Sequence, residues 1–417
     1  MLSVRDLRSF SSPLLTIVLL SLGHGLLSTK IVREMVLREE STFLVAAATA
    51  MNYFGLILLS FSADKFIMRV GHIRGYASAG TIMASSILVQ CFFYEPYLWV
   101  LLRFLQGMCL AVLYVAVESW LLSSSSVANR GQVLSLYMLG IYGAYGVSQL
   151  FLLFGEGVSL DEYIVLAGLF TVMSVTPLTM TRQVQPEVEH HSAMSFSELY
   201  KASQTGMIGC FLAGMLTVSI FGMYPKFLKL AGYATDQDTA WFMFSAITGA
   251  MLLQYPVGWL SDKFDRRFLL MSICAVIVGV ATLIMFFMGV REFLIVLTFI
   301  LGGGIFVIYP ISISHACDVI ETNKILAAIQ GLLLGYGIGA TLGLFVAAPF
   351  IDWLGAYGLF VYIIMIAGTL VGFFLWRSLA SNPVPEEEKT DFRPMTLTTP
   401  VASELDPRSD ENEGKEG

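Results

Sequence analysis

Long apolar segments recur along most of this chain of 417 residues. A helix needs about 20 consecutive apolar residues to cross the roughly 30 Å of hydrocarbon in a bilayer. We find twelve such segments and expect each of them to be a membrane-spanning helix. They cover roughly residues 13–31, 42–62, 76–94, 97–122, 132–154, 162–181, 206–228, 239–260, 268–289, 292–317, 325–349 and 354–377.

The composition agrees with this all-α membrane protein. Hydrophobic residues make up 56% of the chain and charged residues 13%, against about 25% charged residues in soluble domains. This excludes a soluble globular enzyme, a disordered protein and a coiled coil. Five cysteines lie in apolar stretches without paired spacing, so we predict no disulfide framework, no metal site and no cofactor.

The predicted spans form two sets of six around a polar connection. We expect a first six-helix bundle at residues 1–181, a central cytoplasmic loop at 182–205, a second bundle at 206–380 and a disordered acidic cytoplasmic tail at 381–417. The two halves also share short matches, which suggest a duplicated bundle. The matching positions are Asp64-Lys65 with Asp262-Lys263, and Gly107 and Tyr114 with Gly302 and Tyr309.

The charges are unevenly distributed. Residues 382–417 carry ten acids and four bases, whereas the remaining residues carry twenty-one acids and twenty bases, so nothing indicates nucleic-acid binding. Loops on the side of the N-terminus hold thirteen Lys or Arg residues, against six on the other side. Because basic residues concentrate in cytoplasmic loops, we expect both termini in the cytoplasm.

The loop after the eighth span carries a motif. It reads Gly258-Trp-Leu-Ser-Asp262-Lys263-Phe-Asp265-Arg266-Arg267. This resembles the G-x-x-x-D-[RK]-x-G-[RK]-[RK] marker of the major facilitator superfamily, with Asp265 in place of the family's glycine. In the first half, Asp64 and Lys65 fit one register of the marker, and Arg69 and Gly71 fit another.

A second motif lies in the fourth span. Arg103-Phe-Leu-Gln106-Gly107 resembles the R-x-x-Q-G marker of the superfamily's proton-linked drug exporters, although the exporters' Gly-Pro motif in the fifth span is absent. Val117-Glu118-Ser119-Trp120 and Tyr309-Pro310 are similar to the YcaD-like bacterial branch of the superfamily.

This resemblance implies twelve helices in two pseudo-symmetric bundles, the major facilitator fold. It also implies that the loop residues clasp one face of the protein; the alternative is that the bases only follow the charge rule for cytoplasmic loops. The residues that we assign to this gating role are Asp64, Lys65, Asp262, Lys263, Arg266 and Arg267.

Charged residues at membrane depth are costly and need partners or water. Arg103 and Glu118 lie about 60° apart around one predicted helix, and we expect both to face a central cavity. Glu118 is the candidate proton carrier and Arg103 its electrostatic partner; the alternatives are an interfacial Glu118 and a packed Arg103. His315 and Asp318 share a face of the tenth span and are a candidate second proton site, or Asp318 only marks the end of that helix.

Several polar side chains lie singly in apolar segments. Each of them either hydrogen-bonds the solute or holds two helices together. These candidates for substrate binding are His24, Asn52, Gln106, Tyr114, Gln149, Gln254 and Gln330.

The sequence thus favours a secondary active transporter that moves a small amphipathic organic solute across the bacterial inner membrane by alternating access, coupled to protons. Export of a drug or metabolite is slightly favoured over import of a siderophore or nutrient. A transporter-like sensor and a membrane-embedded enzyme are the alternatives of another class. We expect a monomer whose partners are the solute, protons and the lipid bilayer, and we expect no enzymatic activity.

Overall fold

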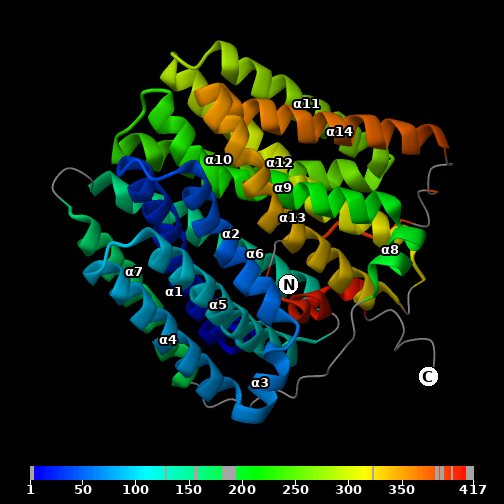
Figure 1. Cartoon of the computed structure of the whole chain (residues 1–417). Helices are drawn as coiled ribbons and strands as arrows, with labels where there is room; N and C mark the ends of the chain where they lie inside the picture. Colours follow the sequence, from blue (N-terminus) through cyan, green and yellow to red (C-terminus); the bar gives the residue numbers. More distant parts are fainter. Residues whose placement is uncertain are drawn as a thin grey trace.

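The structure is a computed structural model. It describes residues 4–126, 129–154, 158–180, 194–321, 324–380, 385, 389–395 and 398–409. Within these residues the chain forms α-helices and short 3-10 helices, and no strand (Figure 1). The all-α prediction is therefore confirmed.

The long helices fall into two sets in chain order. The N-terminal half contains α1 Val4–Leu37, α2 Thr42–Ser60, α4 His72–Phe92, α5 Pro96–Ser124, α6 Arg130–Leu150 and α7 Leu160–Thr179. The C-terminal half contains α9 Gln204–Leu230, α10 Asp236–Lys263, α11 Arg266–Phe286, α12 Arg291–Val319, α13 Ile325–Leu354 and α14 Gly358–Ala380. The short helices are α3 Ala63–Val70, α8 Phe196–Ala202, η1 Phe151–Phe154, η3 Gly355–Tyr357, η5 Pro400–Leu405 and η6 Pro407–Ser409.

Ten segments of the described chain are long and apolar enough to cross a membrane. One of them, Ile325–Ala380, contains both α13 and α14, whereas α4 is absent from the set. Helix α4 begins with His72 and Arg74 and carries several serines, so its mean hydropathy is lower than that of its neighbours. The count of twelve spans therefore stays a prediction.

The helix ends follow local sequence signals. Ser159 and Glu162 form a capping box at the start of α7, and Asp265 caps α11 by accepting a hydrogen bond from the Arg267 backbone N–H. These side chains satisfy N–H groups that have no partner within the helix. Gly71 separates α3 from α4 with φ of 91°, a conformation that glycine adopts readily.

The two halves repeat the same helix pairings. Helix α2 packs on α5, α4 on α7 and α1 on α6, and likewise α10 packs on α12, α11 on α14 and α9 on α13. Gly107 and Gly302 lie at the equivalent crossings: a Cβ on Gly107 would be 2.0 Å from the Asn52 carbonyl oxygen, and one on Gly302 would be 2.3 Å from that of Ala246. Small residues thus allow the same close helix approach in both halves.

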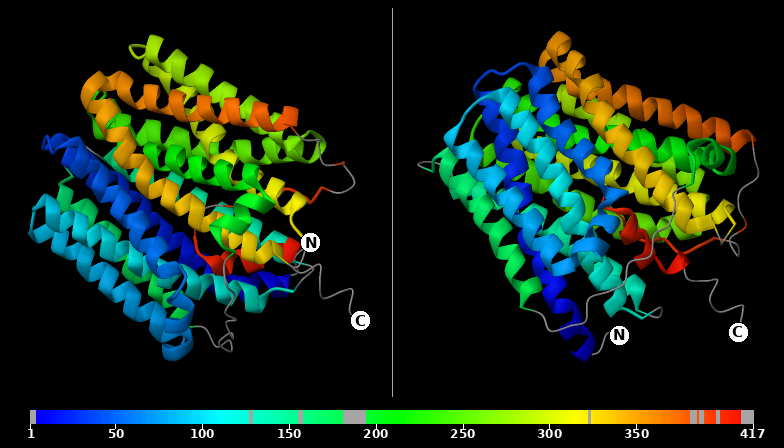
Figure 2. Two further views of the ribbon diagram at one scale, coloured as in Figure 1. Left: turned by 45° about the vertical axis from the view of Figure 1, so that its right-hand side comes forward. Right: turned by 60° about the horizontal axis from the view of Figure 1, so that its bottom comes forward.

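The halves meet along several helix contacts. Helix α2 packs on α13, α6 packs on α10 and α1 packs on α9. Figure 1 shows the N-terminal half at lower left and the C-terminal half at upper right. We call the end where α1 begins and α14 ends the tail end, and the opposite end the far end (Figure 2).

The expected connections are only partly described. In the central loop predicted at 182–205, residues 182–193 lie outside the described residues; α8 and the start of α9 occupy the rest. In the C-terminal tail, residues 389–395 and 398–409 pack against the bundle and bury Met395, Val401 and Leu405. The disordered tail at 381–417 as a whole stays a prediction; the sequence alone did not show that the apolar side chains of η5 would meet α5, α6 and α13.

Candidate functional site

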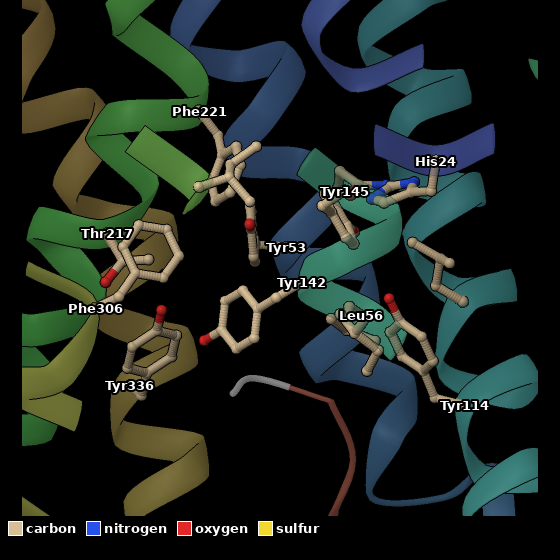
Figure 3. Close-up of a pocket in the computed structure, with 14 residues that line it drawn as sticks. His24, Tyr53, Leu56, Tyr114, Tyr142, Tyr145, Thr217, Phe221, Phe306 and Tyr336 are labelled. Carbon is tan, nitrogen blue, oxygen red and sulfur yellow. The ribbon is translucent and has the colours of Figure 1, made fainter. Parts of the chain in front are cut away.

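A cavity of about 50 Å³ lies between the two halves, near the middle of the bundle. Seven of its lining residues are tyrosine or phenylalanine side chains from both halves, and Figure 3 shows them around the interface. Tyr145 lies 6.1 Å from Phe221 and Tyr142 lies 6.1 Å from Phe306, measured between ring centroids. The remaining three of these seven are Tyr53, Tyr114 and Tyr336.

Three predicted substrate-binding residues line this cavity: His24, Asn52 and Tyr114. The His24 ring packs edge-on against Tyr145, and its Nε2 lies 3.4 Å from the Ser28 hydroxyl. The Asn52 side-chain amide donates a 3.1 Å hydrogen bond to the Arg103 carbonyl oxygen, so it also joins α2 to α5.

The other predicted substrate-binding residues do not line this cavity. Gln106 donates to Gln90 on α4, and Gln149 donates to the Gly25 carbonyl oxygen on α1, so both hold helices together in this conformation. Gln254 donates a 3.1 Å hydrogen bond to the Tyr142 hydroxyl and thereby joins α10 to α6. Gln330 is buried on α13.

Arg103 on α5 is buried and is not among the residues that line the central cavity. Its guanidinium donates to Ser28 at 2.9 Å and to the Gln106 side-chain oxygen at 3.1 Å. Among the described residues no acid pairs with Arg103, so hydroxyl and amide dipoles surround this charge. Arg103 and Glu118 do not contact each other, because they stand near opposite ends of α5.

Glu118 lies toward the tail end and is fully buried. The Tyr137 hydroxyl donates to its Oε1 at 2.7 Å, and the hydroxyl of Thr399 from the C-terminal tail donates to its Oε2. Within the described part of the chain no cation pairs with Glu118. A carboxylate without a cation is expensive to bury, and protonation removes that cost.

His315 and Asp318 are both on α12, but no hydrogen bond joins them in the described residues. Asp318 instead pairs with Arg266 at 2.9 Å and accepts from the Thr390 backbone N–H. His315 is buried near Asp265 and Arg267. The expected second proton site is therefore not assembled from this pair in this conformation.

The loop motif of the C-terminal half ties helices and tail together at the tail end. Arg266 bridges Asp262 on α10 and Asp318 on α12, and Lys263 lies over the Trp259 ring. Arg267 pairs with Asp265 and donates to the Arg377 carbonyl oxygen on α14.

Asp265 lies between α10 and α11. Its burial raises the carboxyl pKa, but the hydrogen bonds and charge of Arg267 outweigh burial, and the pKa is lowered. In the N-terminal half, Asp64 accepts a hydrogen bond from the Lys65 backbone N–H at the start of α3.

An ion-pair cluster joins the two halves at the far end, and sequence reasoning missed it. Arg33 on α1 lies 2.7 Å and Lys30 lies 3.3 Å from the Asp236 carboxylate on α10. Arg33 also donates to the Ala234 carbonyl oxygen at 2.7 Å. In the sequence, Lys30 and Arg33 are only two of the six basic residues on the side opposite the N-terminus, since the sequence does not show that α10 begins opposite them. We call these three residues the far-end latch.

Comparisons with known proteins agree with this architecture. The sequence model of the Major Facilitator Superfamily matches residues 207–405. The MFS-type transporter YcaD of Escherichia coli O17:K52:H18 is 29% identical over 332 residues, which are 78% of this chain and 85% of that protein. YcaD of the K12 strain DH10B is 28% identical over the same length.

Solved structures share the fold at low sequence identity. A mutant form of the nucleoside transporter NupG matches with a TM-score of 0.73 and 13% identity, over 89% of this chain and all of that one. A bacterial homolog of the human lysosomal transporter Spinster, inward-facing and unoccupied, matches with a TM-score of 0.71 and 12% identity, over 94% and 99%. The major facilitator fold predicted from the sequence is thus confirmed.

Proposed function

On its similarity to the Major Facilitator Superfamily model and to the YcaD transporters, we propose that this chain is a secondary transporter of that superfamily, which moves a small, mainly apolar organic solute by proton-coupled alternating access. The observation that carries this proposal is the aromatic cavity between the two halves. The far-end latch joins these halves. We place the protein in the bacterial inner membrane as a monomer, with both termini in the cytoplasm and export as its direction.

The lining of the central cavity supports the substrate class. Aromatic faces from both halves bind apolar or ring-shaped bodies, and the tyrosine hydroxyls orient polar atoms of the solute. No lysine or arginine of the described residues lines the cavity, and the guanidinium of Arg103 is already engaged by Ser28 and Gln106. A polyanion would need several free bases, so a neutral or weakly polar solute fits best.

The small volume of the cavity supports a mechanism in which the two halves move relative to each other. Pockets for organic ligands usually measure about 300–1,000 Å³, whereas this cavity measures about 50 Å³. The halves must therefore separate around it before a solute enters. Such rocking of two repeats around a central site is how inverted-repeat transporters work.

Glu118 is our proposed proton carrier. Its carboxyl group is buried among hydroxyl donors, without a cation among the described residues, and it lies toward the tail end of α5. Rocking of the halves would change its access to water. Loading and release of one proton per cycle would then couple transport to the pH gradient.

The test uses purified protein in lipid vesicles with an imposed pH gradient and a panel of radiolabelled neutral aromatic solutes. Once a transported solute is found, Glu118→Gln should lower gradient-driven transport at least tenfold while solute exchange without a gradient survives. Glu321→Gln is the matched control, because Glu321 is exposed and pairs only locally with Lys324. Undiminished driven transport in Glu118→Gln would remove Glu118 from the mechanism.

A further inference from the structure

The C-terminal residues 389–395 and 398–409, which we call the tail segment, lie between the two halves at the tail end. Within this segment, η5 packs against α5 and α6 of the N-terminal half and against α13 of the C-terminal half (Figure 2). Val401, Ala402 and Leu405 of η5 are buried there. The tail segment thus contacts both halves where a tail-end entrance to the central cavity would open.

Polar anchors attach the tail segment to both halves. Thr399 donates to Glu118 on α5, and Arg408 donates to the Ser314 hydroxyl on α12 at 3.0 Å. The Phe392 backbone N–H donates to Asp262 on α10 at 2.8 Å. These anchors engage one residue proposed to carry protons and one proposed to gate the tail end.

The tail segment fits between the two halves in charge and in shape. The full tail is strongly acidic, but Asp406 and Arg408 form a two-pronged ion pair with each other while both are buried. Their mutual neutralisation lowers the cost of taking them out of water. At Gly258, a Cβ would lie 2.3 Å from the Phe392 ring, so a larger residue would displace that ring.

We propose that the space between the halves at the tail end, bordered by α5, α6, α12 and α13, is a binding site for the chain's own tail segment, which acts as an autoinhibitory plug. The plug blocks entry of solute from the tail end and holds the halves apart there, so the tail end cannot close to complete the cycle. Transport requires the plug to leave. This inference rests on the proposed function only in taking the central cavity and its tail-end entrance as the path of the solute.

The test measures how fast cysteines at the plug site react with N-ethylmaleimide in the full-length protein. Cys317, one turn after Ser314 on α12, is 5% exposed and interacts electrostatically with Arg408 and Asp406. Peptide mass spectrometry follows its labelling without any transported solute. The fully buried Cys274 on α11 is the internal control in the same chain.

Arg408→Ala should release the plug, because it removes the Ser314 anchor and separates buried Asp406 from its arginine. We expect Cys317 labelling to accelerate at least tenfold in Arg408→Ala, with Cys274 unchanged. Arg393→Ala is the matched control, since Arg393 pairs with the exposed Asp391, and it should label like the wild type. Addition of a synthetic peptide of residues 385–409 to a chain truncated after Ala380 should restore protection of Cys317.

A second reporter, Ser314→Cys, places a thiol directly under Arg408 and is compared with and without Arg408→Ala. If neither thiol reacts faster when Arg408 is replaced, the tail segment does not occlude the site and the plug is refuted. That result would leave the proposed transport untouched. Fast labelling of Cys317 in the wild-type protein would refute the plug as well.

Discussion

Replacement of Asp236 by asparagine tests whether the far-end latch holds the two halves together. In this conformation the Asp236 carboxylate pairs with Arg33 at 2.7 Å and with Lys30 at 3.3 Å. The Lys30 and Arg33 side chains are only 5% and 10% exposed. The latch joins α1 to α10, so it exists only while the far end is closed.

The size of the effect follows from burial. Removing one partner of a buried ion pair costs about 3–5 kcal/mol, because the remaining charge stays out of water. The Asp236 side chain is 15% exposed, and asparagine keeps some hydrogen bonding. We therefore expect Asp236→Asn to destabilise the far-end-closed state by about 2–3 kcal/mol. In the open state Lys30 and Arg33 are hydrated, and the cost disappears. Asp236→Asn should therefore shift the equilibrium toward the far-end-open state by about 30–150-fold, at 1.36 kcal/mol per factor of ten.

Double electron–electron resonance measures this shift. Spin labels at Tyr97 and Phe286, which are 70% and 79% exposed near the far end of opposite halves, should move apart in Asp236→Asn. Asp238→Asn is the matched control, because Asp238 pairs with Arg291 at 2.9 Å within the C-terminal half alone. If Asp236→Asn gives the same distance distribution as Asp238→Asn, the latch does not hold the far end closed and the reasoning fails.

Two further substitutions test the packing and the capping. Gly107→Ala should destabilise the fold by about 3 kcal/mol through overpacking, because its Cβ would meet a backbone oxygen at 2.0 Å. The melting temperature in detergent measures this loss. Gly368→Ala is the control and should leave the melting temperature unchanged, because the space around Gly368 is open. Asp265→Ala should remove the N-cap of α11 and cost about 1 kcal/mol. Since its folded-state pKa is lowered, this contribution is present at neutral pH and is lost as the pH falls through that pKa, so the melting temperatures of variant and wild type should converge in acid.

The candidate site was only partly predictable from the sequence. His24, Asn52 and Tyr114 were expected to bind solute and do line the central cavity. Phe221, Phe306 and Tyr336 gave no signal, because apolar aromatic residues are equally suited to packing or to lipid contact. Gln106 and Gln149 turned out to join helices, which a single sequence cannot distinguish from solute binding.

The sequence by itself determined the membrane class, the helical architecture and the resemblance to the major facilitator superfamily, because apolar length and short loop motifs are local properties of the chain. Only the tertiary structure decided which charges meet. Asp236 reaches Arg33 and Thr399 reaches Glu118 across sequence separations of about 200 residues or more. Such pairings depend on how two halves pack, and no local pattern encodes them. The tail segment likewise packs against α5, α6 and α13, helices that come together only when both halves assemble.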